Sequence, residues 1–179
     1  FFNGLCPLLL YMRIFLTGFM GAGKSYWGRQ WADKTGMQFY DLDEVLEQEE
    51  QLSIPVIFET KGESYFRNME TAFLHRLKDV EDCIVSCGGG TPCYNDNMAW
   101  MNEHGTTVFL SATPEQLVSN ILKDKDKRPL LKNVSTEALL DFTRKKLAER
   151  EPYYSAARLS FPVTTLSAST INTIIQHSS

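Results

Sequence analysis

The sequence has no basic tract, and its charge balance is slightly acidic. Its 179 residues include 18 lysines and arginines against 22 aspartates and glutamates, which gives a formal net charge of −4. Proteins that bind long nucleic acids usually carry a basic patch or stripe. We therefore expect no nucleic-acid partner, and we expect a small substrate that local positive charge holds within an acidic surface.

Cysteine and histidine are also scarce, with four cysteines and three histidines in the chain. Cys83 and Cys87 lie close together, but no second cysteine pair and no nearby histidine completes the spacing of a zinc site. A disulfide framework is not expected in a chain of this size and type. We therefore expect reduced thiols in a cytoplasmic protein, with Cys83 and Cys87 in or beside a buried strand.

The N-terminus lacks a long hydrophobic run. The apolar stretch before Met12 is too short to span a membrane, and it has neither the basic start nor the cleavage pattern of a signal peptide. We expect Met12 to be the natural start, residues 1–11 to be a non-native or disordered extension, and no membrane partner. The alternative is a native extension packed on the surface. With no internal repeat or low-complexity linker, residues 12–179 are expected to form one domain and a monomer.

A glycine-rich stretch, RIFLTGFMGAGKS, follows the first short apolar run. It fits the pattern G-x-x-x-x-G-K-[ST] with Gly18, Gly23, Lys24 and Ser25. Glycines let successive backbone N–H groups point into one hollow, and the helix that follows adds its positive N-terminal end. Lys24 can reach the β- and γ-phosphates of a nucleotide, and the Ser25 hydroxyl can bind Mg²⁺. The alternative is a glycine-rich turn with an incidental lysine, but the pattern and its context favour nucleotide binding.

Extended and helical patterns alternate along the chain, which indicates a parallel sheet covered by helices on both faces. Strands are expected at about 13–17, 37–41, 83–87, 106–112 and 159–165. Helices are expected over about 24–34, most of 44–78, 95–105, 113–127, 135–150 and the C-terminus. Ligands of such sheets bind beyond the carboxyl ends of the strands. The chemistry should therefore lie in the loops at 18–25, 41–43, 88–90 and after Leu110.

Two acids and an arginine are candidates near these loops. Asp41 and Asp43 are two residues apart, so in an extended chain both carboxylates face one site, where one could serve Mg²⁺ and the other a substrate hydroxyl. The alternative is an acidic helix N-terminus, which the helix dipole favours. Arg67 has the geometry to hold a planar carboxylate, but by itself it is better explained by a helical pair with Glu70.

Three further features carry weaker signals. Gly88, Gly89 and Gly90 follow a buried strand and permit a close backbone approach to a ligand, although a tight turn is the alternative. The charged segment LKDKDKRPLL could form a mobile flap that delivers Arg128 to a phosphate, or it could be an ordinary exposed loop. Arg150 is expected near the end of a helix, where a cation is favourable in any case.

The order of these motifs strongly resembles that of shikimate kinases. The phosphate loop, D-x-D, F-R-x-x-E, G-G-G, R-P-L-L and E-R-x-P-x-Y follow one another at this spacing from about Met12 to about Tyr154. The resemblance implies an α/β, three-layer P-loop kinase fold with a five-stranded parallel sheet, a helical substrate-binding region at about 43–78 and a mobile lid at about 123–132. It also implies transfer of the ATP γ-phosphate to the 3-hydroxyl of shikimate in aromatic amino-acid biosynthesis.

The resemblance also implies roles for individual residues. The ATP phosphates would be held by Gly21, Ala22, Gly23, Lys24, Ser25 and Tyr26. Ser25 and Asp41 would support Mg²⁺, and Asp43 would hold the shikimate hydroxyls and act as the candidate base. The carboxylate of shikimate would be bound by Arg67 and Arg150, beside the backbone of Gly88, Gly89 and Gly90. Lys24, Asp43 and Arg128 would be the catalytic residues, with Arg128 meeting the transferring phosphate.

Some positions depart from the common pattern of the family. Tyr26 stands where a small hydroxyl residue is usual, and Ile121 and Leu122 stand where a basic residue often flanks the adenine, so no adenine contact is assigned. Another small P-loop kinase, acting on gluconate or a nucleoside monophosphate, is the alternative enzyme. A catalytically silent nucleotide-binding module is the alternative from another class, although the intact Lys24 and Asp43 argue against it.

Overall fold

A five-stranded parallel sheet forms the centre of the molecule. The computed structural model describes residues 12–123 and 134–178. Its strands are β1 (Arg13–Thr17), β2 (Gln38–Asp41), β3 (Cys83–Ser86), β4 (Thr106–Ser111) and β5 (Leu159–Pro162). They lie in the order β2-β3-β1-β4-β5, and every neighbouring pair is parallel. The expected five-stranded parallel sheet is confirmed, with β1 at its centre.

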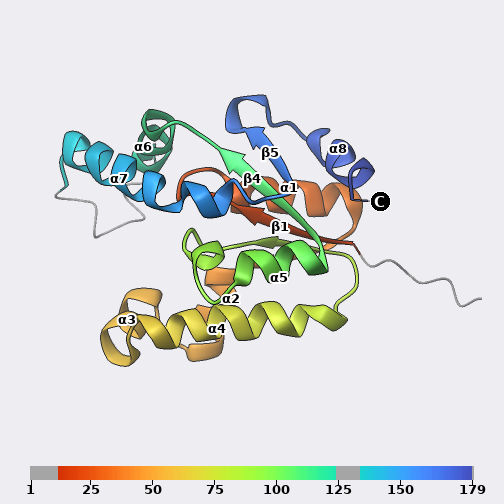
Figure 1. The fold of residues 1–179 in the computed structure, drawn as a ribbon, viewed down its shortest axis with the longest axis horizontal. Coiled ribbons are helices and arrows are strands. Elements are labelled where there is room, and N and C mark those ends of the chain that lie inside the picture. The colour runs from red at the N-terminus through yellow and green to blue at the C-terminus, as the bar shows by residue number, and fades with distance from the viewer. Residues whose placement is uncertain (1–11, 124–133, 179) are drawn as a thin grey trace, which may run out of the picture.

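Helices cover both faces of this sheet and make three layers (Figure 1). One face packs against α1 (Lys24–Thr35) and α8 (Thr170–Gln176), and the other packs against α4 (Glu63–Arg76) and α5 (Asn97–His104). The side chains of β1 alternate accordingly. Ile14 and Leu16 join the cluster that contains Trp31 of α1, whereas Phe15 joins the cluster that contains Phe73 of α4. Alternate residues of a strand point to opposite faces, so a central strand has both sets buried.

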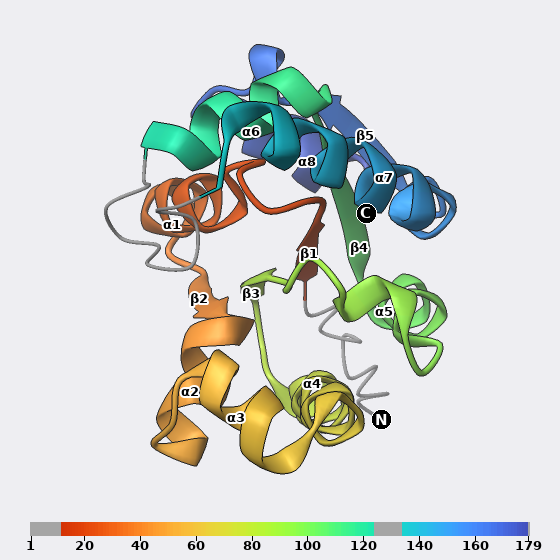
Figure 2. The ribbon, with the colours of Figure 1, turned by 90° about the vertical axis from the view of Figure 1, so that its left-hand side faces the viewer.

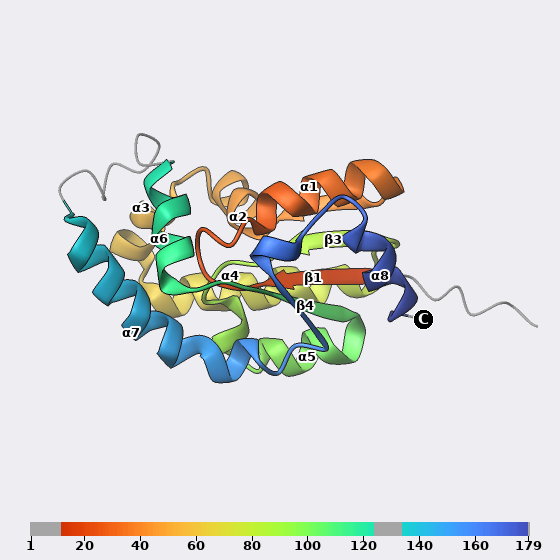
Figure 3. The same cartoon turned by 90° about the horizontal axis from the view of Figure 1, so that it is seen from above.

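The remaining helices lie around the carboxyl ends of the strands. Viewed onto those ends, α2 (Leu42–Glu50) and α3 (Ile54–Lys61) lie on one side, while α6 (Pro114–Lys123) and α7 (Thr136–Tyr154) lie on the other (Figure 2). Seen from above, α6 and α7 pack side by side at the end of the sheet to which β1 points (Figure 3). Short 3-10 helices lie at η1 (Leu77–Asp79), η2 (Thr91–Cys93) and η5 (Val163–Thr165).

Two helix ends have clear caps, and the end of α7 differs from its expected position. Gly36 ends α1 in the left-handed conformation, with φ of 75°, and Ser135 begins α7 by accepting a hydrogen bond from the Ala138 N–H. The sequence predicted that α7 ends at about Arg150, but the helix continues through Pro152 to Tyr154. The reason is tertiary packing, because Tyr154 is fully buried in the core and holds this last turn in place.

Arg13 links the start of the central strand to two helix ends. Its guanidinium donates to the carbonyls of Leu77, Lys78, Val80 and His104 at 2.5–3.3 Å. These carbonyls lie at and just after the C-terminal ends of α4 and α5, where the last carbonyls of a helix have no intrahelical partner. A cation is favourable at such ends, so Arg13 ties β1 to both helices of one face.

Cys83 and Cys87 lie where the sequence analysis expected them. Cys83 lies in β3 and Cys87 directly after it, and both are buried free thiols. Burial raises the pKa of the Cys83 thiol to about 11, so it stays protonated at neutral pH. In residues 12–123 and 134–178, none of the helices combines the length and apolar character that crossing a membrane requires.

Candidate active site

The loop after β1 has the backbone of a phosphate cradle. Gly18, Gly21 and Gly23 have φ values of 136°, 83° and 84°, a region that residues with a side chain rarely adopt. A Cβ at Gly18 would lie 2.8 Å from the Leu110 carbonyl oxygen, and one at Gly21 would lie 2.9 Å from the Leu117 carbonyl oxygen. The glycines are therefore required both for the curl of the loop and for its contact with β4 and α6.

Lys24 is held inside this loop. Its Nζ donates hydrogen bonds to the carbonyl oxygens of Gly18 at 2.8 Å and Phe19 at 3.0 Å. The residue is only 8% exposed, so its ammonium is buried within the loop. Burial lowers the pKa of the ammonium, and the nearby Asp43 carboxylate acts in the opposite direction. The ammonium lies where phosphate oxygens could replace the two carbonyls as its acceptors.

Ser25, Asp41 and Ser86 meet beside the loop. The Ser25 hydroxyl donates to Asp41 Oδ2 at 2.5 Å and lies 3.2 Å from the Ser86 hydroxyl. Mg²⁺ in nucleotide sites takes one or two protein oxygens and completes its shell with water and phosphate. A hydroxyl and a carboxylate beside a phosphate cradle fit this pattern. Among the described residues, no group of three or more histidines, cysteines and acids could hold a metal by itself.

Asp43 lies at the same site, but a different element positions it from the one predicted. The sequence analysis placed Asp41 and Asp43 on one face of an extended chain, but Asp41 ends β2 and Asp43 lies in the first turn of α2. The strand-to-helix junction, rather than an extended chain, brings the two acids together. Burial raises the pKa of Asp43 to about 6, the Asp41 charge adds to this shift, and Lys24 opposes it.

The three glycines after β3 are packed against charged side chains. A Cβ at Gly88 would lie 2.9 Å from Asp43 Oδ1 and also 2.9 Å from Glu70 Oε1. A Cβ at Gly90 would lie 2.7 Å from Arg67 Nη1. The alternative of an ordinary turn does not explain these contacts. The missing side chains let two carboxylates and a guanidinium approach the backbone of the turn.

Arg67 forms the helical pair with Glu70 and also lies against the glycine turn. Its Nη1 donates to Glu70 Oε2 at 2.8 Å, and its Nη2 donates to Glu63 Oε1 at 2.9 Å. Its guanidinium also lies 4.3 Å from the centre of the Tyr94 ring. Glu70 is fully buried and accepts a second hydrogen bond from the Thr91 hydroxyl. This buried acid therefore fixes Arg67 beside the glycine turn.

Arg150 also lies against the glycine turn. It lies on α7, and its guanidinium carbon lies 5.5 Å from the centre of the Phe19 ring in the phosphate loop. A Cβ at Gly89 would lie 3.2 Å from Arg150 Nη1. Arg67 and Arg150 therefore flank one turn, although 83 positions separate them in the sequence. Two guanidiniums at one turn suit a small carboxylate.

Several contacts at this site were not predicted from the sequence. The Ser86 hydroxyl at Ser25 and the buried position of Glu70 depend on strand and helix packing, although a serine two residues before G-G-G was a usable signal. Asn120 donates to the Gly21 carbonyl at 3.0 Å and ties α6 to the phosphate loop. Tyr26 is 62% exposed and contacts the Trp27 ring edge to face. Arg128 and nearly all of the expected lid lie outside the described residues.

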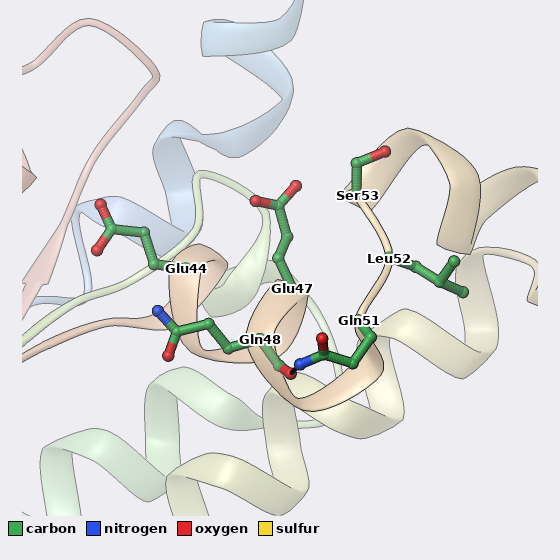
Figure 4. A pocket seen from close by; sticks show the side chains of 6 residues that line it. All are labelled: Glu44, Glu47, Gln48, Gln51, Leu52 and Ser53. Atoms are coloured by element: carbon green, nitrogen blue, oxygen red, sulfur yellow. Dashed lines mark hydrogen bonds between the residues drawn. The ribbon is translucent and has the colours of Figure 1, made fainter.

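Two pockets lie apart from the phosphate loop. One, with a volume of about 410 Å³, lies on α2, where Glu44 and Glu47 project from the same side of the helix (Figure 4). Glu44 forms an ion pair with Arg29, and Glu47 accepts a hydrogen bond from the Ile54 N–H. Both carboxylates therefore already have partners within the protein. The other, of about 400 Å³, lies between α5 and the end of α7.

A glycine-rich cradle at the end of the central strand of a parallel sheet is the defining feature of P-loop nucleotide-binding proteins. The acid and the arginines beside it add a place for a small anionic acceptor. The molecule is therefore a small P-loop kinase. It belongs to the shikimate kinase family, whose sequence model matches residues 20–178.

Relatives and solved structures agree with this assignment. The chain is 44% identical to a shikimate kinase of Phocaeicola vulgatus over 149 residues, which cover 83% of this chain and 85% of that protein. A crystal structure of shikimate kinase from Bacteroides thetaiotaomicron matches with a TM-score of 0.83 and 36% identity, over 93% of this chain and 95% of that one. Shikimate kinase from Acinetobacter baumannii, solved in complex with shikimate, matches with a TM-score of 0.78 and 32% identity, over 93% and 92%.

Proposed function

We propose that this protein transfers the γ-phosphate of ATP to the 3-hydroxyl of shikimate, giving ADP and shikimate 3-phosphate. The single observation that carries the proposal is the glycine turn between Arg67 and Arg150, with the Asp43 carboxylate against its first glycine. Shikimate is a small anion with neighbouring hydroxyls, so its recognition requires cations for the carboxylate and an acceptor for the hydroxyls. This site provides both beside a phosphate cradle.

In this proposal Arg67 and Arg150 bind the carboxylate of shikimate, and the backbone of Gly88, Gly89 and Gly90 lines the acceptor. Asp43 accepts a hydrogen bond from the reacting hydroxyl. The raised pKa of Asp43, about 6, leaves it ionised at neutral pH but a stronger base than an ordinary aspartate. It is therefore suited to orient the hydroxyl and to receive its proton.

The phosphate loop is assigned to ATP, with contacts from Gly21, Ala22, Gly23, Lys24, Ser25 and Tyr26. Ser25 and Asp41 would hold Mg²⁺, which when bound offsets charge on the phosphates. The 3-oxygen of shikimate forms a bond to the γ-phosphorus, while the bond from that phosphorus to the bridging oxygen of ADP breaks. Lys24 offsets the charge that develops on the leaving oxygen. Arg128, outside the described residues, is assigned to the transferring phosphate from the family resemblance.

The proposal extends to the setting of the enzyme. We propose a monomer in the cytoplasm with a small-molecule acceptor and neither a nucleic-acid nor a membrane partner. The net charge of −4 supports the absence of a nucleic-acid partner. The assignment of Arg128 and the segment around it to a lid is part of this proposal only.

The test is release of ADP with Mg²⁺, ATP and one acceptor at a time. We expect rapid release with shikimate and little with gluconate or with nucleoside monophosphates. Preference for gluconate or a nucleotide would instead support the alternative kinase. ATP binding without turnover of any acceptor would support a silent nucleotide-binding module.

A further inference from the structure

Tyr154 completes the E-R-x-P-x-Y pattern, and the proposed function gives it no role. Its side chain is fully buried, and its ring stacks on Phe109 of β4 at 5.1 Å between ring centres and 24° between planes. Its hydroxyl donates a hydrogen bond of 2.5 Å to the carbonyl oxygen of Gly89. A residue of α7 thus contacts the middle of the glycine turn, 65 positions away in the sequence.

The three carbonyls of the turn take their hydrogen bonds from different sources. The Gly88 carbonyl accepts from the Thr91 N–H at 3.1 Å, and the Gly90 carbonyl accepts from the Cys93 N–H at 2.9 Å. Both donors belong to η2, directly after the turn. The Gly89 carbonyl instead takes its donor from α7. Because glycine rotates freely about its backbone bonds, the middle peptide depends on this remote contact for its orientation.

The orientation of this peptide affects both candidate carboxylate-binding arginines. In a trans peptide the C=O and the N–H point in opposite directions, so the bond to the Gly89 carbonyl also sets the direction of the Gly90 N–H. Gly89 lies against Arg150, and Gly90 lies against Arg67. A rotation of the peptide would therefore change the space available to both guanidiniums.

The Tyr154 hydroxyl donates to the Gly89 carbonyl, which can only accept, and the phenol oxygen can still accept from Arg150. Burial raises the pKa of Tyr154 to about 12, although Arg150 acts in the opposite direction, so the phenol is neutral at physiological pH. Arg150 and Tyr154 are four residues apart on α7, and such residues share one face of a helix. The same stretch of α7 therefore supplies Arg150, a candidate ligand of the substrate, and Tyr154, whose hydroxyl holds the glycine turn next to Arg150.

We propose that Tyr154 is a positioning residue for the acceptor: its hydroxyl holds the Gly89–Gly90 peptide so that the turn, Arg67 and Arg150 are spaced for a small carboxylate. This inference rests on the proposed function for the identity of the acceptor. It goes beyond that function by placing a determinant of acceptor affinity in the core, away from the reacting atoms.

The kinetic test compares Tyr154→Phe with Tyr153→Phe, which removes the same hydroxyl from the exposed neighbouring residue. For Tyr154→Phe we expect the KM for shikimate to rise roughly five- to tenfold, as for the loss of one net hydrogen bond, while the KM for ATP is unchanged. Tyr153→Phe should match the wild type. A KM for shikimate that is equal in the two variants would overturn the proposal.

A second variant separates positioning from general loss of packing. Phe109→Leu loosens the ring stack but keeps the Tyr154 hydroxyl, so it should lower the melting temperature without a comparable rise in the KM for shikimate. If Phe109→Leu raises this KM as much as Tyr154→Phe does, the hydroxyl has no specific role and the proposal is wrong.

An NMR test without substrate keeps the inference separate from the proposed function. We expect Tyr154→Phe to shift the backbone amide signals of residues 88–90 and the Nε–H signal of Arg150, whereas Tyr153→Phe leaves them in place. Amide signals that do not move would contradict the positioning role whatever the enzyme phosphorylates. If these signals move but the wild type does not phosphorylate shikimate, the proposed function fails while the peptide contact stands.

Discussion

At the scale of single residues, burial acts on the two candidate catalytic groups in opposite senses. It lowers the pKa of the Lys24 ammonium and raises the pKa of the Asp43 carboxyl, because a buried site penalises either charge. Each residue also favours the charged form of the other. The attraction between Lys24 and Asp43 thus offsets only part of the cost of burying their charges. We expect the phosphates of ATP to interact with Lys24 and the hydroxyls of the acceptor to interact with Asp43.

Lys24→Ala should reduce turnover by at least about 100-fold, since a preorganised donor at the phosphates is lost. The exposed Lys145 of α7 offers a matched control, and Lys145→Ala should retain full activity. Steady-state rates at saturating ATP would provide the comparison. The assignment of the nucleotide site would be contradicted if Lys24→Ala stayed within about twofold of the wild type.

Asp43 should make stability depend on pH. Its pKa is raised from 3.8 to about 6, so the folded protein holds this proton more tightly than the unfolded chain does. Its stabilising contribution is complete below about pH 4 and is lost as the pH rises through about 6. The gain in free energy of unfolding from Asp43→Asn should therefore grow between about pH 4 and pH 7.

Urea denaturation of the protein without nucleotide or metal measures this difference. Asp33→Asn is the control, because Asp33 is exposed on α1 and should show no such trend. A difference between Asp43→Asn and the wild type that stays constant with pH would mean that the folded protein does not raise this pKa.

At the scale of elements, the site lies where the carboxyl ends of the strands contact the surrounding helices. The glycine pattern and the alternation of elements were enough to predict that β1, β2 and β3 deliver their loops to one edge. They were not enough to predict that α2 begins at Leu42, because an apolar residue between two acids suits a strand as well as a helix. The same limit applies to Pro152, where core packing of Tyr154 continues a helix that local rules would end.

Arg67→Ala and Arg150→Ala should each weaken shikimate binding by about 2–5 kcal/mol, as expected when a desolvated charge pair loses one partner. ATP binding should be largely retained. Arg144→Ala on the exposed face of α7 is the matched control, since Arg144 pairs with Glu115 at the surface. Calorimetric titration gives both affinities. Unchanged shikimate affinity in both site variants would remove the two arginines from the acceptor site.

Arg13 should be a determinant of stability rather than of activity. Arg13→Met leaves the carbonyls at the ends of α4 and α5 without their charged donor, and we expect a loss of roughly 2–3 kcal/mol in the free energy of unfolding. Arg76→Met removes an exposed ion pair with Glu49 and should change stability by no more than about 0.5 kcal/mol. Equal effects of the two variants in urea denaturation would contradict the linking role of Arg13.

At the scale of the whole molecule, we expect the fold to position the nucleotide and a few side chains to determine which acceptor binds. The sequence predicted the sheet, the phosphate loop and the family, because these depend on local patterns in a fixed order. It did not predict the contacts of Ser86 with Ser25, of Glu70 with Thr91 or of Tyr154 with Gly89. Each of these joins residues far apart in the chain, and such contacts follow only from the packing of the elements.

The most direct test of the account is the identity of the phosphorylated product. The purified protein would be incubated with Mg²⁺, ATP and shikimate, and the product would be examined by mass spectrometry and by ¹H–³¹P correlation NMR. The account predicts one new phosphate ester, on the 3-oxygen of shikimate, formed in equal amount to ADP. Formation of ADP with only inorganic phosphate, or a phosphate on another hydroxyl, would contradict the arrangement of Asp43, Arg67 and Arg150 around the acceptor.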